Sequence, residues 1–121
     1  MTDHGPFYQI EGRDAPGRVV LVCEHASNRF PPPWDGALGL TDDQRRAHIA
    51  WDPGALGLAR GLAQALKAPL IHATASRLIY DLNRPPHAPG AMPARSEIHD
   101  IPGNADLSPD QRLARARAHY I

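Results

Sequence analysis

The stretch Val19-Val20-Leu21-Val22-Cys23-Glu24-His25-Ala26-Ser27-Asn28 joins five consecutive apolar residues to a polar cluster. A short β-branched run of this kind is typical of a strand that is buried on both faces of a parallel sheet. The polar residues then lie at the carboxyl end of that strand, where open α/β sheets bind their ligands. The sequence therefore predicts a buried strand over 18–23 that ends in ionisable groups at a ligand-binding edge.

Three helices are predicted from their first residues. Thr41 and Gln44 occupy the positions of a capping box, and Ser108 and Gln111 do the same further along the chain. Asp52-Pro53 offers a preferred N-cap followed by proline at the first helical position. The residues after it recur at helical spacing and predict one apolar face, formed by Ala55, Ala59, Leu62, Ala63 and Leu66.

Two more strands are predicted, over 70–74 and 78–80, whereas the Pro-, Gly- and Ala-rich segment 85–104 is typical of a long loop. Strands that alternate with helices indicate an α/β fold with a mostly parallel or mixed sheet. About three strands are fewer than a typical sheet contains, and the last helix runs to Ile121 without a stop signal. We therefore expect an incomplete sheet, and self-association through this last helix.

The composition limits the classes of function. A chain of 121 residues allows at most one domain, over 18–121, which a flexible leader over 1–17 precedes. Lys plus Arg and Asp plus Glu number 13 each, so the chain lacks the basic excess of a nucleic-acid binder. No apolar run reaches the ~20 residues that span a membrane, and the single Cys23 fits a reducing cytoplasm.

Ionisable groups follow the predicted strands. A neutral imidazole at His25 can bind a metal or act as a base, and a half-buried histidine bonded to the backbone is the alternative. Arg77 and Arg84 flank the predicted strand 78–80 and suit recognition of carboxylates, against the alternative of surface salt bridges, with Asp81 orienting one of them. Asp52 is best explained as a helix cap that contributes ~1 kcal/mol, although its carboxylate can also bind a metal.

Four segments resemble the N-formylglutamate amidohydrolase family in order and spacing. They are 23–28, 51–55, 76–84, and 101–104 with the Arg-rich helix after it. Asp81-Leu82-Asn83-Arg84 is also similar to a stretch of the aspartoacylase and succinylglutamate desuccinylase group. The resemblance implies a three-layer α/β sandwich of the phosphorylase/hydrolase-like, zinc-exopeptidase-like kind, of which 18–121 is the N-terminal portion.

The resemblance also implies an activity, the metal-assisted hydrolysis of an N-acyl amino acid. In the named reaction, which belongs to histidine catabolism, N-formylglutamate gives formate and glutamate. A divalent metal, expected to be zinc, would polarise the acyl carbonyl and lower the pKa of a water molecule to near neutrality.

By this resemblance His25 and Asp52 are metal ligands, and Glu24 and Arg77 are the catalytic candidates. The residues expected to bind substrate are Ser27, Asn28, Arg77, Asn83 and Arg84. Arg84 with Asn83 would hold the α-carboxylate, and Arg77 a second carboxylate or the oxyanion. Asn28 stands where the wider zinc-acylase group has the glutamate of its His-x-x-Glu pair. The alternatives are a non-catalytic binding module for small acidic amino acids and an inactive fragment.

Overall fold

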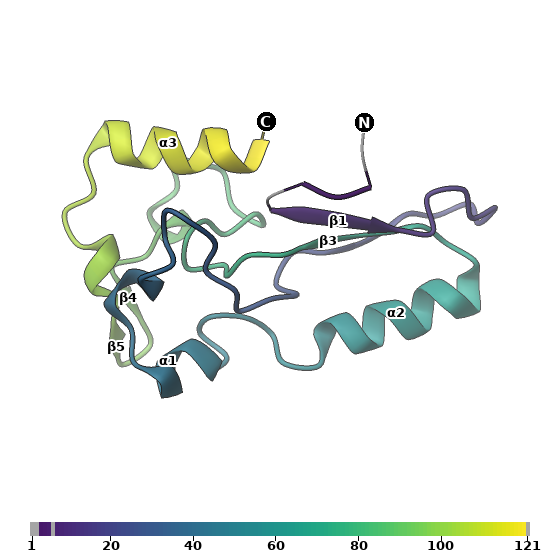
Figure 1. The fold of residues 1–121 in the computed structure, drawn as a ribbon, viewed down its shortest axis with the longest axis horizontal. Coiled ribbons are helices and arrows are strands. Elements are labelled where there is room, and N and C mark those ends of the chain that lie inside the picture. The colour runs from purple at the N-terminus through teal and green to yellow at the C-terminus, as the bar shows by residue number, and fades with distance from the viewer. Residues whose placement is uncertain (1–2, 6, 121) are drawn as a thin grey trace.

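The sheet is built on a parallel pair of strands. In the computed structural model, β2 (Leu21–Cys23) runs parallel to β3 (Leu70–Ala73), with Cys23 opposite His72. β1 (Tyr8–Glu11) pairs with the other edge of β3 in the antiparallel direction (Figure 1), and the strand order is therefore β1-β3-β2. The prediction of an α/β chain with a mixed sheet is therefore confirmed.

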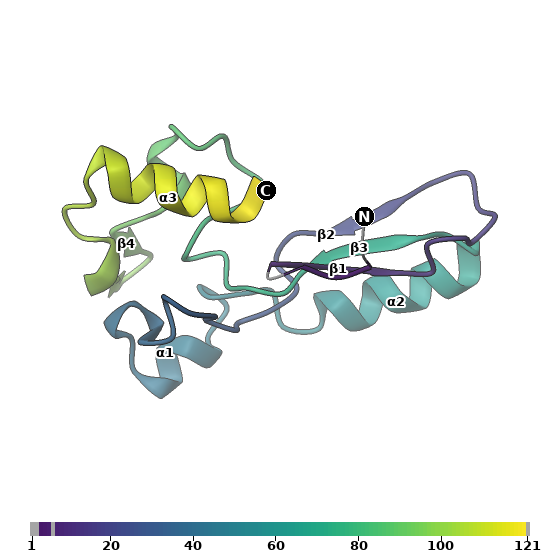
Figure 2. The ribbon, with the colours of Figure 1, turned by 45° about the horizontal axis from the view of Figure 1, so that its top comes forward.

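The structure describes residues 3–5 and 7–120, the last of these by its backbone alone, so Ile121 lies outside the described residues. The helices of this part are α1 (Asp42–Arg46), α2 (Ala55–Leu66) and α3 (Pro109–Tyr120). α2 lies along one face of the sheet, whereas α1 and α3 lie apart from each other toward the opposite end of the molecule (Figure 2). None of the helices among the described residues has the length and apolar character needed to cross a membrane.

The prediction of a flexible leader over 1–17 does not hold for the four residues of β1, which form a strand of the sheet. The carboxylate of Glu11 accepts a forked pair of hydrogen bonds from Arg60 of α2, the shorter at 2.7 Å, and lies 2.8 Å from Nε2 of buried His72 on β3. The hydrogen bond from Arg60 is the main reason that the pKa of Glu11 lies below its usual value, against the opposite effect of burial. One carboxylate thus ties together β1, β3 and α2.

The start of α2 differs from the prediction. Its N-cap is Gly54, which adopts a left-handed conformation with φ 86°, and Asp52 lies outside the helix. The prediction that Asp52 caps this helix is therefore wrong. Of the predicted apolar face, three alanines pack on the sheet, whereas Leu62 and Leu66 remain exposed. The packed alanines are Ala55, Ala59 and Ala63.

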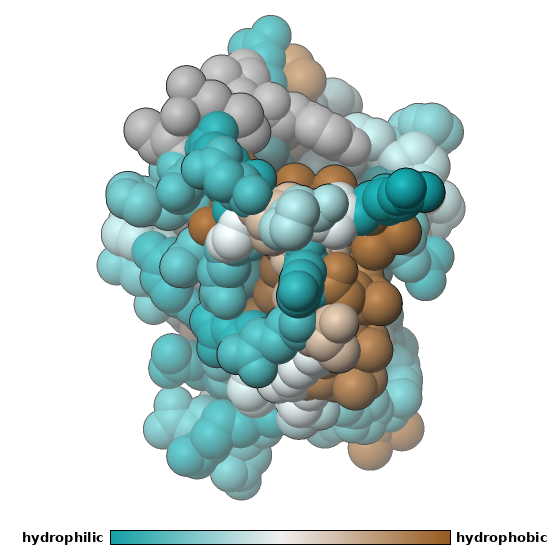
Figure 3. Space-filling view, turned by 90° about the vertical axis from the view of Figure 1, so that its right-hand side faces the viewer, coloured by the Kyte–Doolittle hydropathy of each residue, from teal (hydrophilic) through white to brown (hydrophobic). Residues whose placement is uncertain are grey.

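Part of the apolar surface of the sheet and α2 stays open (Figure 3). Val22 is 58 % exposed, so the prediction that 18–23 is buried on both faces is wrong. β2 is an edge strand, and alternate side chains of a strand point to opposite faces. Leu21 and Cys23 pack against α2, and Val22 projects from the other face. The other exposed apolar side chains here are Val19 and Val20, which precede β2, and Leu58, Leu62 and Leu66 of α2.

Both predicted capping boxes are confirmed. At α1, the Gln44 N–H donates to Thr41 Oγ1 at 3.2 Å, and the Thr41 N–H donates to Gln44 Oε1 at 3.0 Å. At α3, Ser108 and Gln111 make the same reciprocal bonds at 3.1 and 2.8 Å. These bonds join residues three positions apart, which is why the local sequence is enough to predict them.

Residues 77–79 form a turn, so the strand predicted over 78–80 is wrong. The side chain of Ser76 accounts for the difference. Its hydroxyl donates to the carbonyl of Ala50 at 2.7 Å and accepts the N–H of Leu78 at 3.2 Å. A side chain that bonds its own backbone in this way competes with strand pairing.

The predicted long loop 85–104 contains regular structure. β4 (Arg95–Ser96) and β5 (His99–Asp100) form a short antiparallel hairpin, between single 3-10 turns at Pro89–Ala91 and Pro102–Asn104. A further 3-10 turn occupies Ala37–Gly39.

Cys23, the last residue of β2, is a buried free cysteine. Burial is the largest of the effects that raise the pKa of its thiol, and the negative charges of Glu24 and Asp52 raise it further. The thiol therefore stays protonated at neutral pH.

We expect Ser76→Ala to lower the free energy of unfolding by about 1–3 kcal/mol, because it removes the buried 2.7 Å hydrogen bond to Ala50 and the acceptor of the Leu78 N–H. Urea unfolding followed by circular dichroism measures the change. Ser96→Ala, at a half-buried position of the hairpin, is the control and should stay within about 0.5 kcal/mol of the wild type. Equal unfolding midpoints for the Ser76 variant and the wild type would contradict the account of this turn.

Candidate functional site

Four side chains form a closed ring of contacts near the carboxyl ends of β2 and β3. His25 Nδ1 lies 3.2 Å from Asp52 Oδ2, and His25 Nε2 lies 2.7 Å from Asp81 Oδ1. Arg77 donates from Nη1 to Asp52 Oδ1 at 3.3 Å and from Nη2 to Asp81 Oδ2 at 3.1 Å. An imidazole and a guanidinium thus each bridge the same two carboxylates, in what we name the four-residue ring.

Backbone hydrogen bonds place the members of the ring. The N–H of Asp52 donates to the carbonyl of His25 at 2.9 Å, and the N–H of Arg77 donates to the carbonyl of Ala50 at 3.3 Å. Because β2 and β3 are parallel, the segments that leave their carboxyl ends meet at one edge of the sheet. The polar side chains that follow these two strands therefore come together, and Asp52 lies beside them.

Asp81 is the buried member of the ring, with 3 % of its surface exposed. It also accepts the backbone N–H of Asn83 at 3.0 Å, and Arg84 Nε lies 3.4 Å from its Oδ2. Burial is the largest single effect on the pKa of Asp81 and raises it. The hydrogen bonds from His25 and Asn83, with the charges of His25 and Arg77, outweigh burial and bring this pKa below its usual value. The sequence predicts that Asp81 orients one of the two arginines, and in the structure it contacts both Arg77 and Arg84.

Both ring nitrogens of His25 face carboxylate oxygens. An ionised carboxylate only accepts hydrogen bonds, and a neutral imidazole carries one N–H. An N–H on Nε2 satisfies the shorter contact with buried Asp81, which leaves the lone pair of Nδ1 facing Asp52 Oδ2. Nδ1 and Oδ2 are then both hydrogen-bond acceptors and repel each other. A proton or another cation between these two atoms removes the repulsion.

A zinc ion suits this pair of donors. Zinc binds histidine nitrogen and carboxylate oxygen at about 2.0–2.2 Å, so two donors on one tetrahedral ion lie roughly 3.3 Å apart. A carboxylate on the other ring nitrogen, here Asp81, is the usual partner of a metal-ligating histidine. Within residues 3–5 and 7–120, no group of three His, Cys, Asp or Glu is arranged to hold a metal ion. His25 and Asp52 offer two donors, whereas a catalytic zinc needs three protein ligands.

The other predicted residues after β2 have local contacts. Ser27 Oγ accepts the N–H of Arg29 at 3.1 Å, and the Asn28 amide donates to the carbonyl of Arg45 at 2.9 Å. Glu24 is half-buried next to Cys23. No hydrogen bond or ion pair among the described residues joins these three side chains to the four-residue ring, so their functional roles stay predictions.

A cavity of about 260 Å³ opens beside the ring, and Asp81 and three arginines line it. The arginines are Arg77, Arg84 and Arg95. Gly90 lies close to the Arg84 guanidinium, since a Cβ added at Gly90 would be 2.8 Å from Arg84 Nη1. The cavity therefore presents several cationic groups to a small anionic ligand. Asn83 is exposed and contributes its backbone N–H to Asp81.

Arg95 is a candidate residue that the sequence reasoning missed. It lies on β4, in the segment that was expected to be a loop. Its Nε donates to the carbonyl of Glu97 at 3.2 Å, and its Nη1 donates to Asp100 Oδ1 at 3.2 Å. Neither periodicity nor the spacing of neighbouring residues distinguishes this arginine in the sequence.

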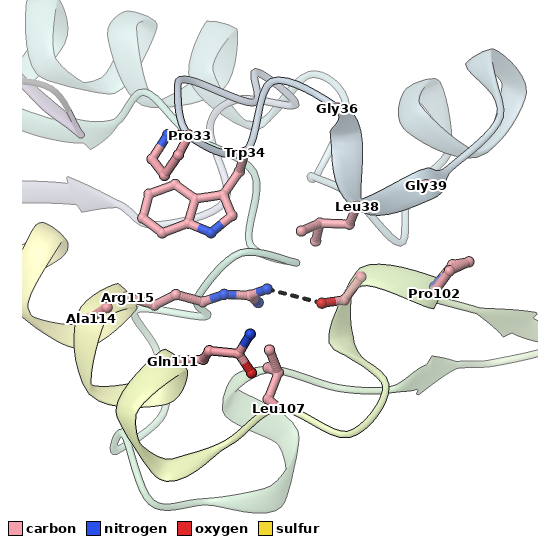
Figure 4. A pocket seen from close by; sticks show the side chains of 11 residues that line it. Pro33, Trp34, Gly36, Leu38, Gly39, Pro102, Leu107, Gln111, Ala114 and Arg115 are labelled. Atoms are coloured by element: carbon pink, nitrogen blue, oxygen red, sulfur yellow. Dashed lines mark hydrogen bonds between the residues drawn. The ribbon is translucent and has the colours of Figure 1, made fainter.

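A larger cavity, of about 650 Å³, lies between α3 and the loop 33–39 and is mostly apolar around Arg115 (Figure 4). Arg115 is buried, and its guanidinium donates to the carbonyls of Ile79 and Gly103, each at 3.1 Å. Burial lowers the pKa of Arg115 to about 10. Ile79 lies in the turn that precedes Asp81. The hydrogen bond from Arg115 to the Ile79 carbonyl therefore helps to hold this turn in place beside the four-residue ring.

The fold and the ring define a mixed α/β protein with a carboxylate–histidine–arginine centre. Residues 17–121 match the model of the N-formylglutamate amidohydrolase family, and the chain belongs to this family. This confirms the resemblance seen in the sequence.

The chain is also similar to the crystal structure of the gene product Atu2144 from Agrobacterium tumefaciens. The two are 51 % identical with a TM-score of 0.91, over 96 % of this chain and 46 % of that one. The chain thus spans about half the length of this relative. No curated protein matches the chain.

We expect Asp81→Asn to lower the free energy of unfolding at pH 7 by about 2 kcal/mol, because it removes charge-assisted hydrogen bonds. The native pKa of Asp81 lies below its unfolded value of about 3.9. Its stabilising effect is therefore complete above that unfolded value and is lost as the pH falls through the native pKa. The variant should lose less stability than the wild type between pH 5 and acid unfolding.

Urea unfolding at a series of pH values measures both effects. Asp14→Asn, at an exposed position, is the matched control and should follow the wild type throughout. If Asp81→Asn followed the wild type at pH 7, the central role of this carboxylate would be wrong.

Proposed function

We propose that this protein contributes to a metal-dependent hydrolase that cleaves the amide C–N bond of N-acyl amino acids such as N-formylglutamate. The observation that carries the proposal is the four-residue ring next to a cavity lined by three arginines. Membership of the N-formylglutamate amidohydrolase family supports it. The expected partner is a small N-acyl amino acid.

His25 and Asp52 would hold a divalent ion, for which their donor atoms favour zinc. Such an ion supplies Lewis acidity toward the acyl carbonyl and activates a water molecule. Asp81 fixes the orientation of the His25 ring through the 2.7 Å contact. Arg77 would stabilise negative charge that develops on the acyl oxygen.

Arg84 with Asn83 would bind the α-carboxylate of the substrate, because a guanidinium matches a carboxylate in a two-pronged pair. Glu24, half-buried one residue before His25, is the proposed proton-transfer group. We assign Ser27 and Asn28 as further polar groups near the substrate.

We also propose a three-layer, zinc-exopeptidase-like sandwich for the family domain. The support is the sheet face opposite α2, where Val22 is 58 % exposed. A second helical layer would remove this apolar surface from water.

A non-catalytic binding module for small acidic amino acids is the second candidate. The arginines of the cavity favour it as much as they favour the enzyme, because they recognise carboxylates without a metal. The two proposals differ in whether binding needs the metal.

We expect the chain to bind Zn²⁺ and to release little or no formate from N-formylglutamate, because His25 and Asp52 are only two of the three protein ligands of a catalytic zinc. Asp81→Asn should weaken zinc affinity about 10- to 100-fold, because it removes the carboxylate that orients a ligand. Competition with a chelating dye measures zinc affinity, and a formate dehydrogenase assay measures turnover. Arg117→Ala, at an exposed position of α3, is the control and should leave both unchanged.

Three results discriminate between the proposals. Binding of N-formylglutamate that requires zinc, with or without release of formate, supports the enzyme. Binding of N-formylglutamate that a chelator does not affect, without turnover, supports the binding module. A chain that binds neither zinc nor N-formylglutamate would rule out both.

A further inference from the structure

The cavity beside the four-residue ring combines polar and apolar walls. Its apolar wall is formed by Ile49, Leu78 and Pro93. Its polar wall is formed by the three arginines together with Asp81, Ser96 and Glu97. A ligand with charged ends and methylene groups between them matches this distribution.

The three arginines of the cavity are not equivalent. Arg77 already contacts two carboxylates of the protein, Asp52 and Asp81, so both edges of its guanidinium are in use. Arg84 has a longer contact, 3.4 Å from its Nε to Asp81, and the end of its guanidinium lies against Gly90. Arg84 therefore has more capacity than Arg77 to accept a carboxylate from a ligand.

Arg95 approaches the cavity from the hairpin. Its Nε and Nη1 are anchored by the carbonyl of Glu97 and the carboxylate of Asp100, and these two contacts leave Nη2 for a ligand. Asp100 is 78 % exposed, so this ion pair is screened by water and a ligand carboxylate can compete with it. The other carboxylate of the hairpin, that of Glu97, is 2.9 Å from His48.

We infer that Arg95 is a specificity-determining residue that binds a second carboxylate of the substrate. This inference rests on the proposed function. It assigns the α-carboxylate to Arg84 and the side-chain carboxylate to Arg95, and it restricts Arg77 to the acyl group. The methylene groups of the substrate then lie along the apolar wall.

Isothermal titration calorimetry of the chain with N-formylglutamate and with N-formylglutamine tests this assignment. The two ligands differ only in whether the side chain ends in a carboxylate or a neutral amide. We expect Arg95→Ala to weaken binding of N-formylglutamate by about tenfold or more, because a charge-assisted pair is lost. Binding of N-formylglutamine should change by less than about twofold, since a neutral amide bonds an arginine more weakly.

Two further variants complete the experiment. Arg95→Lys keeps the charge without the planar fork and should fall between the wild type and Arg95→Ala. Arg117→Ala is the matched control for the loss of one positive charge and should leave both affinities unchanged.

The outcomes separate this inference from the proposed function. If Arg95→Ala weakened both ligands equally or neither of them, the assignment of Arg95 would be wrong while the proposed function stood. If the wild-type chain bound neither ligand, the proposed function would fail and this inference with it.

Discussion

The parallel register of β2 and β3 is the constraint on which the site depends. It sets the segment that carries His25 beside the turn that begins at Arg77 and leads to Asp81. A shift of one residue would turn the side chains of β2 to the opposite face of the sheet. Cys23 would then leave its packing against α2, and Val22 would take its place. The register is therefore fixed by what each face of the strand buries.

Local signals in the sequence were sufficient for the helix starts at Thr41 and Ser108, because each cap depends on residues three positions apart. The sequence was insufficient where a distant partner decides the structure. β1 is a strand because β3 pairs with it and Arg60 neutralises Glu11. The apolar residues 78–80 are not a strand, because Ser76 bonds the backbone of this segment and of Ala50 instead.

In the candidate site, too, some features follow from local sequence and others depend on distant partners. The apolar run before His25 predicted that this side chain lies at a strand end, and the structure agrees. The role of Asp52 could not be decided from its position before a proline, because the choice between a cap and the ring depends on the left-handed turn at Gly54. Arg95 could not be predicted, since only the three-dimensional path of the hairpin brings it to the cavity.

The single cysteine at the end of β2 has a consequence for experiments on this chain. Alkylating reagents attack the thiolate, and Cys23 is both buried and held in its protonated form. Labelling must therefore wait for the edge strand to separate from α2. Because the chain contains no other thiol, the rate of modification reports how often this one part of the molecule opens. Alkylation of Cys23 therefore measures local opening of the structure at a position two residues before His25 of the candidate site.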